Sequence, residues 1–233
     1  MAEAGLAFIL IILIGFVALA FLPQMWVKRV IAQHAADRPD IPGTGGQFAR
    51  HLLDRLGLSQ VGVEETSAGD HYDPDTKTVR LLKQNYAGRS LSAVVIAAHE
   101  VGHAMQDATG YSPLSTRTRL ARQAARIQSI GAVIMLLAPV LLILAKSPAI
   151  LLVEVVAGLM FLSLAIVIHA VTLPVEYDAS FRRALPLLQA GQFLKAEDMP
   201  AARRILRAAA LTYVAAAALS LLDVMRWMRM LRF

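Results

Sequence analysis

The stretch VIAAHEVGHAMQD, residues 95–107, places two histidines and a glutamate in an otherwise apolar run. His99 and His103 are four positions apart, just over one turn of an α-helix, so their imidazoles emerge from the same helix face. Two neutral imidazoles on one face can bind a divalent metal ion, and Glu100 is placed beside them to move a proton. The stretch therefore predicts a helix with a metal site of the H-E-x-x-H type.

The alternative is a purely structural role, in which His99 bonds a backbone carbonyl and Glu100 pairs with an arginine. A buried glutamate between two histidines is costly without a cation, and this favours the metal. Gly102 and the small residues near it leave room for another element to approach the helix closely.

The composition is typical of a membrane protein. Of the 233 residues, 57% are hydrophobic and 17% are charged, against about 25% charged in a typical soluble domain. The mean hydropathy is +0.55. The net charge of +6 would suit a nucleic-acid partner, but no aromatic stacking motif accompanies the charge. We therefore expect no nucleic-acid partner. The absence of cysteine excludes disulfides, thiolate metal sites and a cysteine nucleophile.

Four apolar segments are long enough to cross a bilayer, which takes about 20 residues each. They cover residues 6–27, 127–145, 149–173 and 208–225. Lys and Arg number 13 in residues 28–126 and 6 in residues 174–207, and four lie elsewhere, which places both polar segments in the cytoplasm. We therefore expect a mainly α, multi-pass protein of the cell membrane. It would have about four transmembrane helices and a small α+β zincin-like cytoplasmic domain that carries the H-E-x-x-H helix.

The same pattern predicts five parts of the chain. They are an N-terminal transmembrane helix (1–27), a zincin-like domain (28–126), a transmembrane hairpin (127–173), a cytoplasmic segment with the third ligand (174–207) and a C-terminal transmembrane helix (208–233).

Local signals predict the elements of the zincin-like domain. Thr44 can cap a helix over GGQFARHLLDRLGL, and Ser90 or Ser92 can cap the motif helix. VGVEET and KTVRLL read as short strands, with a turn at Pro74 before the second. KTVRLL is expected either at a sheet edge, where it could pair with an extended peptide, or as an ordinary sheet strand.

A catalytic zinc site needs a third protein ligand and an open position for water. The metzincin pattern requires histidine six residues after His103, and that position is Thr109. The candidates are Glu176, Asp178, Asp223, His71, Asp107 and His169. Two predicted spans separate His103 from Glu176 and return the chain to the same membrane face. Asp223 reaches the motif only if its helix dips into the bilayer, and His169 is better suited to helix packing.

Four stretches, HYDPDTKTVRL, IAAHEVGHAMQDATGYSPL, TLPVEYDAS and RAAALTYVAAA, resemble the YugP-type membrane zinc metallopeptidase family in order and spacing. The family is related to the HtpX-type peptidases. The resemblance covers most of the chain and implies a gluzincin-like peptidase. It implies that Zn²⁺ is bound by His99, His103 and Glu176, and that Glu100 is the catalytic glutamate.

The implied activity is hydrolysis of peptide bonds in protein substrates at or near the cytoplasmic membrane surface. Besides the substrate, we expect the chain to contact membrane lipid, and to form an oligomer or bind a regulatory membrane partner. Zinc would polarise the scissile carbonyl, and Glu100 would carry the proton from water to the leaving amine. Candidates for an additional oxyanion donor are Tyr177, Arg182, His71 and Tyr72. HtpX-type peptidases have an aspartate four residues after the ligand glutamate. Here that position is Ser180, and the nearest carboxylate is Asp178, so the residue that supports a ligand histidine stays open.

Three other functions compete with this interpretation. A site-2-type intramembrane protease would use Asp223 as a ligand, but that class commonly has glycine next and this chain has Val224. A non-catalytic zinc-binding scaffold would gain nothing from Glu100 as a base. A metal transporter would need polar residues spaced along several spans.

Overall fold

The structure is a computed structural model, and it describes residues 15, 18, 21–127, 156, 160, 167, 168, 170–191 and 193–212. The chain divides into two units. One unit, called the compact unit below, comprises Met25–Ser115 and Leu173–Thr212 and contains the H-E-x-x-H stretch. The other comprises the remaining residues. The five predicted domain boundaries stay predictions.

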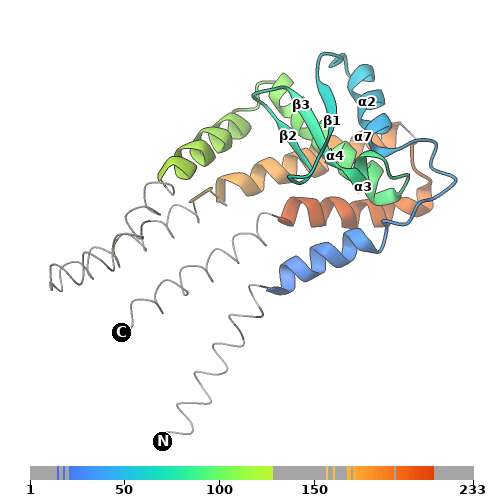
Figure 1. Cartoon of the computed structure of the whole chain (residues 1–233), viewed down its shortest axis with the longest axis horizontal. Helices are drawn as coiled ribbons and strands as arrows, with labels where there is room; N and C mark the ends of the chain where they lie inside the picture. The colour runs from blue at the N-terminus through green and yellow to red at the C-terminus, as the bar shows by residue number, and fades with distance from the viewer. Residues whose placement is uncertain are drawn as a thin grey trace, which may run out of the picture. The chain divides into compact units, whose positions relative to one another are not determined.

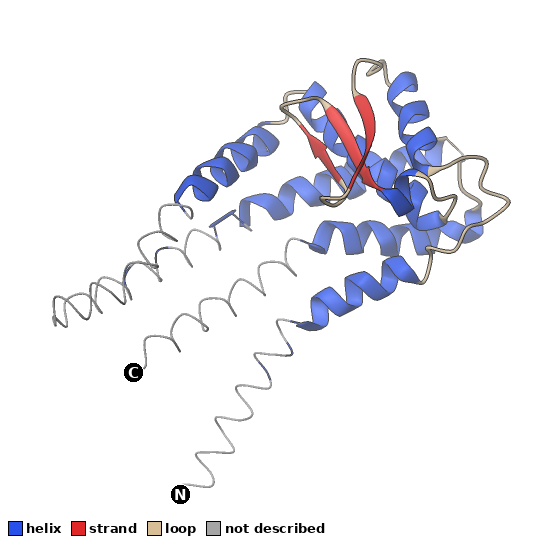
Figure 2. Ribbon diagram, viewed as in Figure 1, coloured by secondary structure: helices blue, strands red, loops and turns tan. Residues whose placement is uncertain are grey.

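A three-stranded sheet lies in the compact unit, in the order β1-β3-β2 (Figure 2). β1 (Gly62–Thr66) runs parallel to β3 (Thr78–Leu82), and β2 (His71–Asp73) runs antiparallel to it. A tight turn joins β2 to β3, and Lys77 at its end has a left-handed φ of 52°. The strands predicted from VGVEET and KTVRLL are confirmed as β1 and β3. KTVRLL forms the central strand of this sheet, so of the two alternatives the ordinary sheet strand is confirmed and the edge strand is excluded.

Figure 1 labels the two main helices of this unit, and a side-chain cap explains where each of them begins. Thr44 precedes α2 (Gly45–Arg55) and forms a reciprocal capping box with Gln47. Ser90 precedes α4 (Leu91–Ala108) and accepts from the backbone N–H of Ala93. Both predicted helix starts are confirmed.

Further helical segments complete the described chain. They are α3 (Lys83–Tyr86), the π-helix η1 (Asp178–Ala184), α7 (Leu185–Ala190), the 3-10 turn η2 (Ala196–Asp198) and helices at residues 21–32, 112–127, 170–177 and 199–212.

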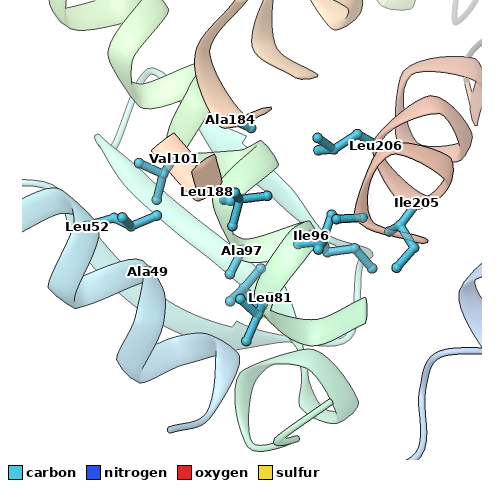
Figure 3. Packing of buried hydrophobic residues seen from close by; sticks show 14 of the residues in the cluster. Ala49, Leu52, Leu81, Ile96, Ala97, Val101, Ala184, Leu188, Ile205 and Leu206 are labelled. Carbon is cyan, nitrogen blue, oxygen red and sulfur yellow. The ribbon is translucent and has the colours of Figure 1, made fainter. Parts of the chain in front are cut away.

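The hydrophobic core surrounds α4, which contacts α2, the sheet, η1 and α7. Figure 3 shows side chains from these elements meeting around it. Leu52 of α2, Leu81 of β3, Leu188 of α7 and Leu206 of the helix at 199–212 are each 2% exposed or less. Because the core encloses α4 on several sides, the polar residues of this helix are held among apolar neighbours.

Gly102 sets the distance between α4 and η1. A Cβ atom at this position would lie 2.6 Å from the carbonyl oxygen of Ala179, closer than a real Cβ contact. The backbone of η1 can therefore approach α4 only because residue 102 has no side chain. This confirms the expectation that small residues allow a second element to approach the motif helix.

The predicted architecture of about four transmembrane helices was wrong. Within the part of the chain that the structure describes, no helix combines the length and the apolar character needed to cross a membrane. The helix at 112–127 carries four arginines and the helix at 199–212 carries three, while the apolar residues of α4 are used in the core of the compact unit. Most residues of the four predicted spans lie outside the described ranges.

Candidate metal centre

The motif helix presents its two histidines side by side. The rings of His99 and His103 lie with their centroids 4.8 Å apart at an interplanar angle of 79°. Their residues are only 4% and 5% exposed. This arrangement follows from the four-residue spacing on α4, which brings both side chains to one helix face.

Glu176 meets the histidine pair from a segment more than 70 residues away. Its Oε2 atom lies 3.2 Å from Nε2 of His99 and 3.3 Å from Nε2 of His103. One ligand atom from each residue lies within 4.8 Å of the other two, and all three residues are buried. The structure therefore brings together the three residues that the sequence predicted as metal ligands.

The outer nitrogen of each histidine faces an acceptor. Nδ1 of His99 lies 2.9 Å from Oγ of Ser180, whose own hydroxyl donates to the carbonyl of Leu206 at 3.1 Å. Nδ1 of His103 lies 2.9 Å from the side-chain oxygen of Gln106. Each Nδ1 is thus the N–H donor of its ring, which leaves a lone pair on each Nε2.

This donor set fits a divalent cation. Two Nε2 lone pairs and one carboxylate oxygen converge with no N–H directed between them, so an ion at their centre would satisfy all three. Two imidazoles and one carboxylate are a preferred ligand set for catalytic zinc. The chemistry of the residues present therefore supports zinc binding here.

Burial penalises the ionised form of Glu176. It raises the pKa of this carboxyl, and only histidines that were charged and donated to it would lower that pKa, whereas both rings here carry their proton on Nδ1 and a lone pair on Nε2. The side chain is 1% exposed. A buried anion of this kind requires a neighbouring cation, as a metal ligand would have.

The two residues left open by the sequence both take part. The hydroxyl of Ser180 lies against Nδ1 of His99, so Ser180 supports this histidine. Asp178 accepts from Gln106 at 2.9 Å and from Nε of Arg183 at 2.7 Å. Burial raises the pKa of Asp178, but these donors lower it overall, so the group stays ionised.

Glu100 lies on α4 between the two histidines and is 5% exposed. This burial fits a residue that works inside the site and not one on the solvated surface. Its role as a proton carrier stays a prediction.

The other predicted candidates lie outside the cluster or outside the described residues. Oδ2 of Asp107 accepts from the hydroxyl of Tyr72 at 2.6 Å and from Nζ of Lys77 at 2.5 Å. These contacts engage Asp107 and the Tyr72 hydroxyl outside the histidine cluster. Nδ1 of His71 lies 2.8 Å from the carbonyl of Gly69. Tyr177 is 55% exposed. Two further candidates, His169 and Asp223, are not among the residues that the structure describes.

Gln106 is the residue that sequence reasoning missed. It follows His103 by three positions, so it lies on the same face of α4 one turn later. That spacing was visible in the sequence, but its partners Val175 and Asp178 were not.

The chain is similar to zinc peptidases along most of its length. A family model described as "Putative neutral zinc metallopeptidase" matches residues 9–232. The chain is 35% identical over 222 residues to a protein of Bacillus subtilis (strain 168) named "Putative membrane protease YugP", and the match covers 92% of each chain. No solved structure matches the chain. The family match includes every residue of the buried cluster.

Proposed function

The chain belongs to the neutral zinc metallopeptidase family, and from this premise we propose that His99, His103 and Glu176 bind its zinc and that Glu100 is its catalytic base. The chain is a zinc metallopeptidase, a hydrolase of peptide bonds. The observation that carries the ligand assignment is the approach of both Nε2 atoms to Oε2 of Glu176, at 3.2 and 3.3 Å. Three protein ligands leave a coordination position open, as catalytic zinc requires.

Zinc, Glu100 and Glu176 would have different roles in peptide hydrolysis. Bound zinc would supply a Lewis acid that polarises the scissile carbonyl and makes water more acidic. Glu100 accepts a proton from the attacking water and later delivers it to the leaving amide nitrogen. The C–O bond forms as water adds to the carbonyl carbon, and the C–N bond breaks once Glu100 has delivered the proton to the nitrogen, so the amine leaves neutral and the other product is a carboxylic acid. The ionised Glu176 serves as a ligand and takes no part in proton transfer.

A catalytic role is favoured over a structural zinc site. Structural sites usually have four protein ligands, whereas three residues form the cluster in the described part of the chain. Glu100 beside those ligands would be costly to bury in a site that needs no base. A zinc-binding scaffold therefore explains fewer of the observations.

A site-2-type peptidase with Asp223 as a ligand is also less well supported. Glu176 already occupies the position opposite both histidines, so the third protein ligand is supplied without Asp223.

The substrates that we propose are proteins or peptides at a membrane. This part of the proposal is supported by the name of the relative, "Putative membrane protease YugP", which matches 92% of the chain. The helix at residues 21–32 adds support, since Met25 and Trp26 are exposed, at 63% and 39%, directly before Lys28 and Arg29. An exposed tryptophan beside basic residues is typical of a membrane–water interface.

The proposal is tested by measuring bound zinc and peptide hydrolysis in the purified full chain. Replacing any one ligand by alanine should abolish stoichiometric zinc binding. Glu100→Gln should retain zinc and lower kcat/KM by about 10²–10⁴-fold, the usual contribution of a general base. Glu65→Gln, which changes an exposed glutamate on β1, is the matched control and should change neither quantity.

Two outcomes would contradict the proposal. Full zinc content in Glu176→Ala would show that this residue is not a ligand. Equal cleavage by the unmodified chain and by Glu100→Gln would mean that the activity comes from another site.

A further inference from the structure

We propose that Gln106 is a positioning residue, whose single side-chain amide fixes both His103 and the segment that carries Glu176. The proposal rests on the zinc site proposed above and adds a residue outside the ligand set. Gln106 lies one turn after His103 on α4 and is 0% exposed. A fully buried amide must find all its hydrogen-bond partners within the protein, so its neighbours determine its orientation.

Two acceptors fix the orientation of this amide. Nε2 of Gln106 donates to the carbonyl of Val175 at 2.8 Å and to Oδ2 of Asp178 at 2.9 Å. A backbone carbonyl only accepts, so the NH₂ group must face Val175 and Oε1 must face His103. Oε1 lies 2.9 Å from Nδ1 of His103 and accepts its proton. Nε2 of that ring is therefore left as the unprotonated nitrogen, the form that binds a metal ion.

The same amide also holds the third ligand. Val175 and Asp178, which receive its two N–H groups, lie on either side of Glu176 in the chain. Through one side chain, α4 thus fixes the turn that presents Glu176 to the histidines. Removing the amide should loosen two ligands together, one from each segment.

Asp178 is itself held from the end of α4. Nε of Arg183 donates to Oδ2 of Asp178 at 2.7 Å, and a terminal nitrogen of Arg183 donates to Oγ1 of Thr109 at 3.2 Å. The same guanidinium lies 5.5 Å from the ring centroid of Tyr111. The contacts form a closed loop from α4 through η1 and back to α4. Because each member has a fixed partner, the amide is ordered before a metal ion binds.

The test is the rate at which the loaded chain loses zinc to a chromophoric chelator. Gln106→Met keeps a similar length but removes both polar groups. Gln106→Glu keeps an acceptor for Nδ1 of His103 but sets a carboxylate oxygen against the carbonyl of Val175 and the carboxylate of Asp178. We expect dissociation to be about 10–100-fold faster in both variants, as is typical when a ligand-supporting residue is lost. The visible spectrum of the cobalt-substituted protein should shift as well.

Asn85→Leu is the matched control. Asn85 is another buried amide, 3% exposed, and it donates to Asp70 at 2.8 Å outside the metal cluster. Its replacement should lower the unfolding temperature without changing zinc dissociation. Far-UV circular dichroism and thermal unfolding check that every variant is folded.

The results separate this inference from the ligand assignment. If His103→Ala keeps stoichiometric zinc, the assignment itself is wrong. If His103→Ala loses zinc while either Gln106 variant releases it at the unmodified rate, only the role of Gln106 is refuted. An equal acceleration in Asn85→Leu would also refute it, because the effect would then be a general consequence of losing a buried amide.

Discussion

The hydroxyl of Ser180 lies 2.9 Å from Nδ1 of His99, although the two residues are 81 positions apart in the chain. The same hydroxyl donates to the carbonyl of Leu206. One small side chain thus joins the motif helix, the π-helical segment and the helix at 199–212. The orientation of His99, a proposed zinc ligand, depends on all three.

Ser180→Ala should weaken zinc binding because Nδ1 of His99 loses its acceptor and the ring is no longer held toward Glu176. We expect the zinc dissociation constant to rise about 10-fold or more. Competition with a chelator of known affinity measures it. Ser92→Ala is the control, since Ser92 is equally buried on α4 but donates to the carbonyl of His34. An unchanged affinity in Ser180→Ala would count against this contact.

Gly102→Ala should damage both stability and zinc binding. The added Cβ would lie 2.6 Å from a backbone oxygen of Ala179, so η1 must move away from α4. Overpacking of this kind typically costs about 1–3 kcal/mol. Denaturant unfolding and zinc stoichiometry measure the two effects. Ala104→Gly, in the same helix, should cost about 1 kcal/mol through helix propensity and leave zinc binding intact.

Removing zinc should lower the stability of the folded chain. Zinc that binds only the folded state at about 1,000 times its dissociation constant adds about 4 kcal/mol to the unfolding free energy. Thermal unfolding with and without a chelator should therefore show a lower melting temperature when zinc is withdrawn. Glu176→Ala should unfold at the same temperature in both conditions. A chelator effect that persists in this variant would point to a different binding site.

Acid should remove a small stabilisation that involves Asp73. Burial raises the pKa of this carboxyl, but donation from Arg80 at 2.6 Å and from the backbone N–H of Asp75 at 2.9 Å outweighs burial and lowers its pKa to about 2. A carboxyl whose pKa is lowered by folding contributes its full stabilisation at pH values above its pKa in the unfolded chain, which is 3.8 here. The stabilisation is lost as the pH falls from 3.8 through about 2.

The variant Asp73→Asn isolates this effect. It should lower the unfolding free energy by about 0.5–1 kcal/mol at pH 7, as is usual for a solvated ion pair, and by much less near pH 2. Denaturant titrations at the two pH values give the difference. A constant gap between the two proteins would show that ionisation of Asp73 is not the cause.

The elements with local signals were predictable from the sequence. Thr44 and Ser90 are caps, and each marks a helix start that the structure confirms. β1 and β3 were recognised from their β-branched residues and the turn at Pro74. β2 was missed because three residues carry too weak a pattern, and the central position of β3 depends on pairing that no local signal encodes.

The candidate site was predictable only where a local sequence signal marks its residues. His99 and His103 follow from their spacing within one helix, whereas Glu176 had to come from family resemblance and chain topology. Gln106 was missed because its meaning depends on Asp178, 72 positions away. The four-span architecture was wrong, since no helix in the described part of the chain has the length and apolar character to cross a membrane, and most residues of the predicted spans lie outside the described ranges.

The π-helical turn at Asp178–Ala184 carries a consequence for insertions and deletions. An α-helix would place residue 183 about 140° around the axis from residue 178, whereas the wider turn brings Arg183 back over Asp178. The segment thus accommodates one surplus residue between Glu176 and α7. Deleting a single residue from residues 178–184 would convert the wide turn to ordinary α-helix and leave Glu176, Leu185 and Leu188 close to their present directions. A deletion in α7 has no such surplus, and it would rotate the residues that follow it by about 100°.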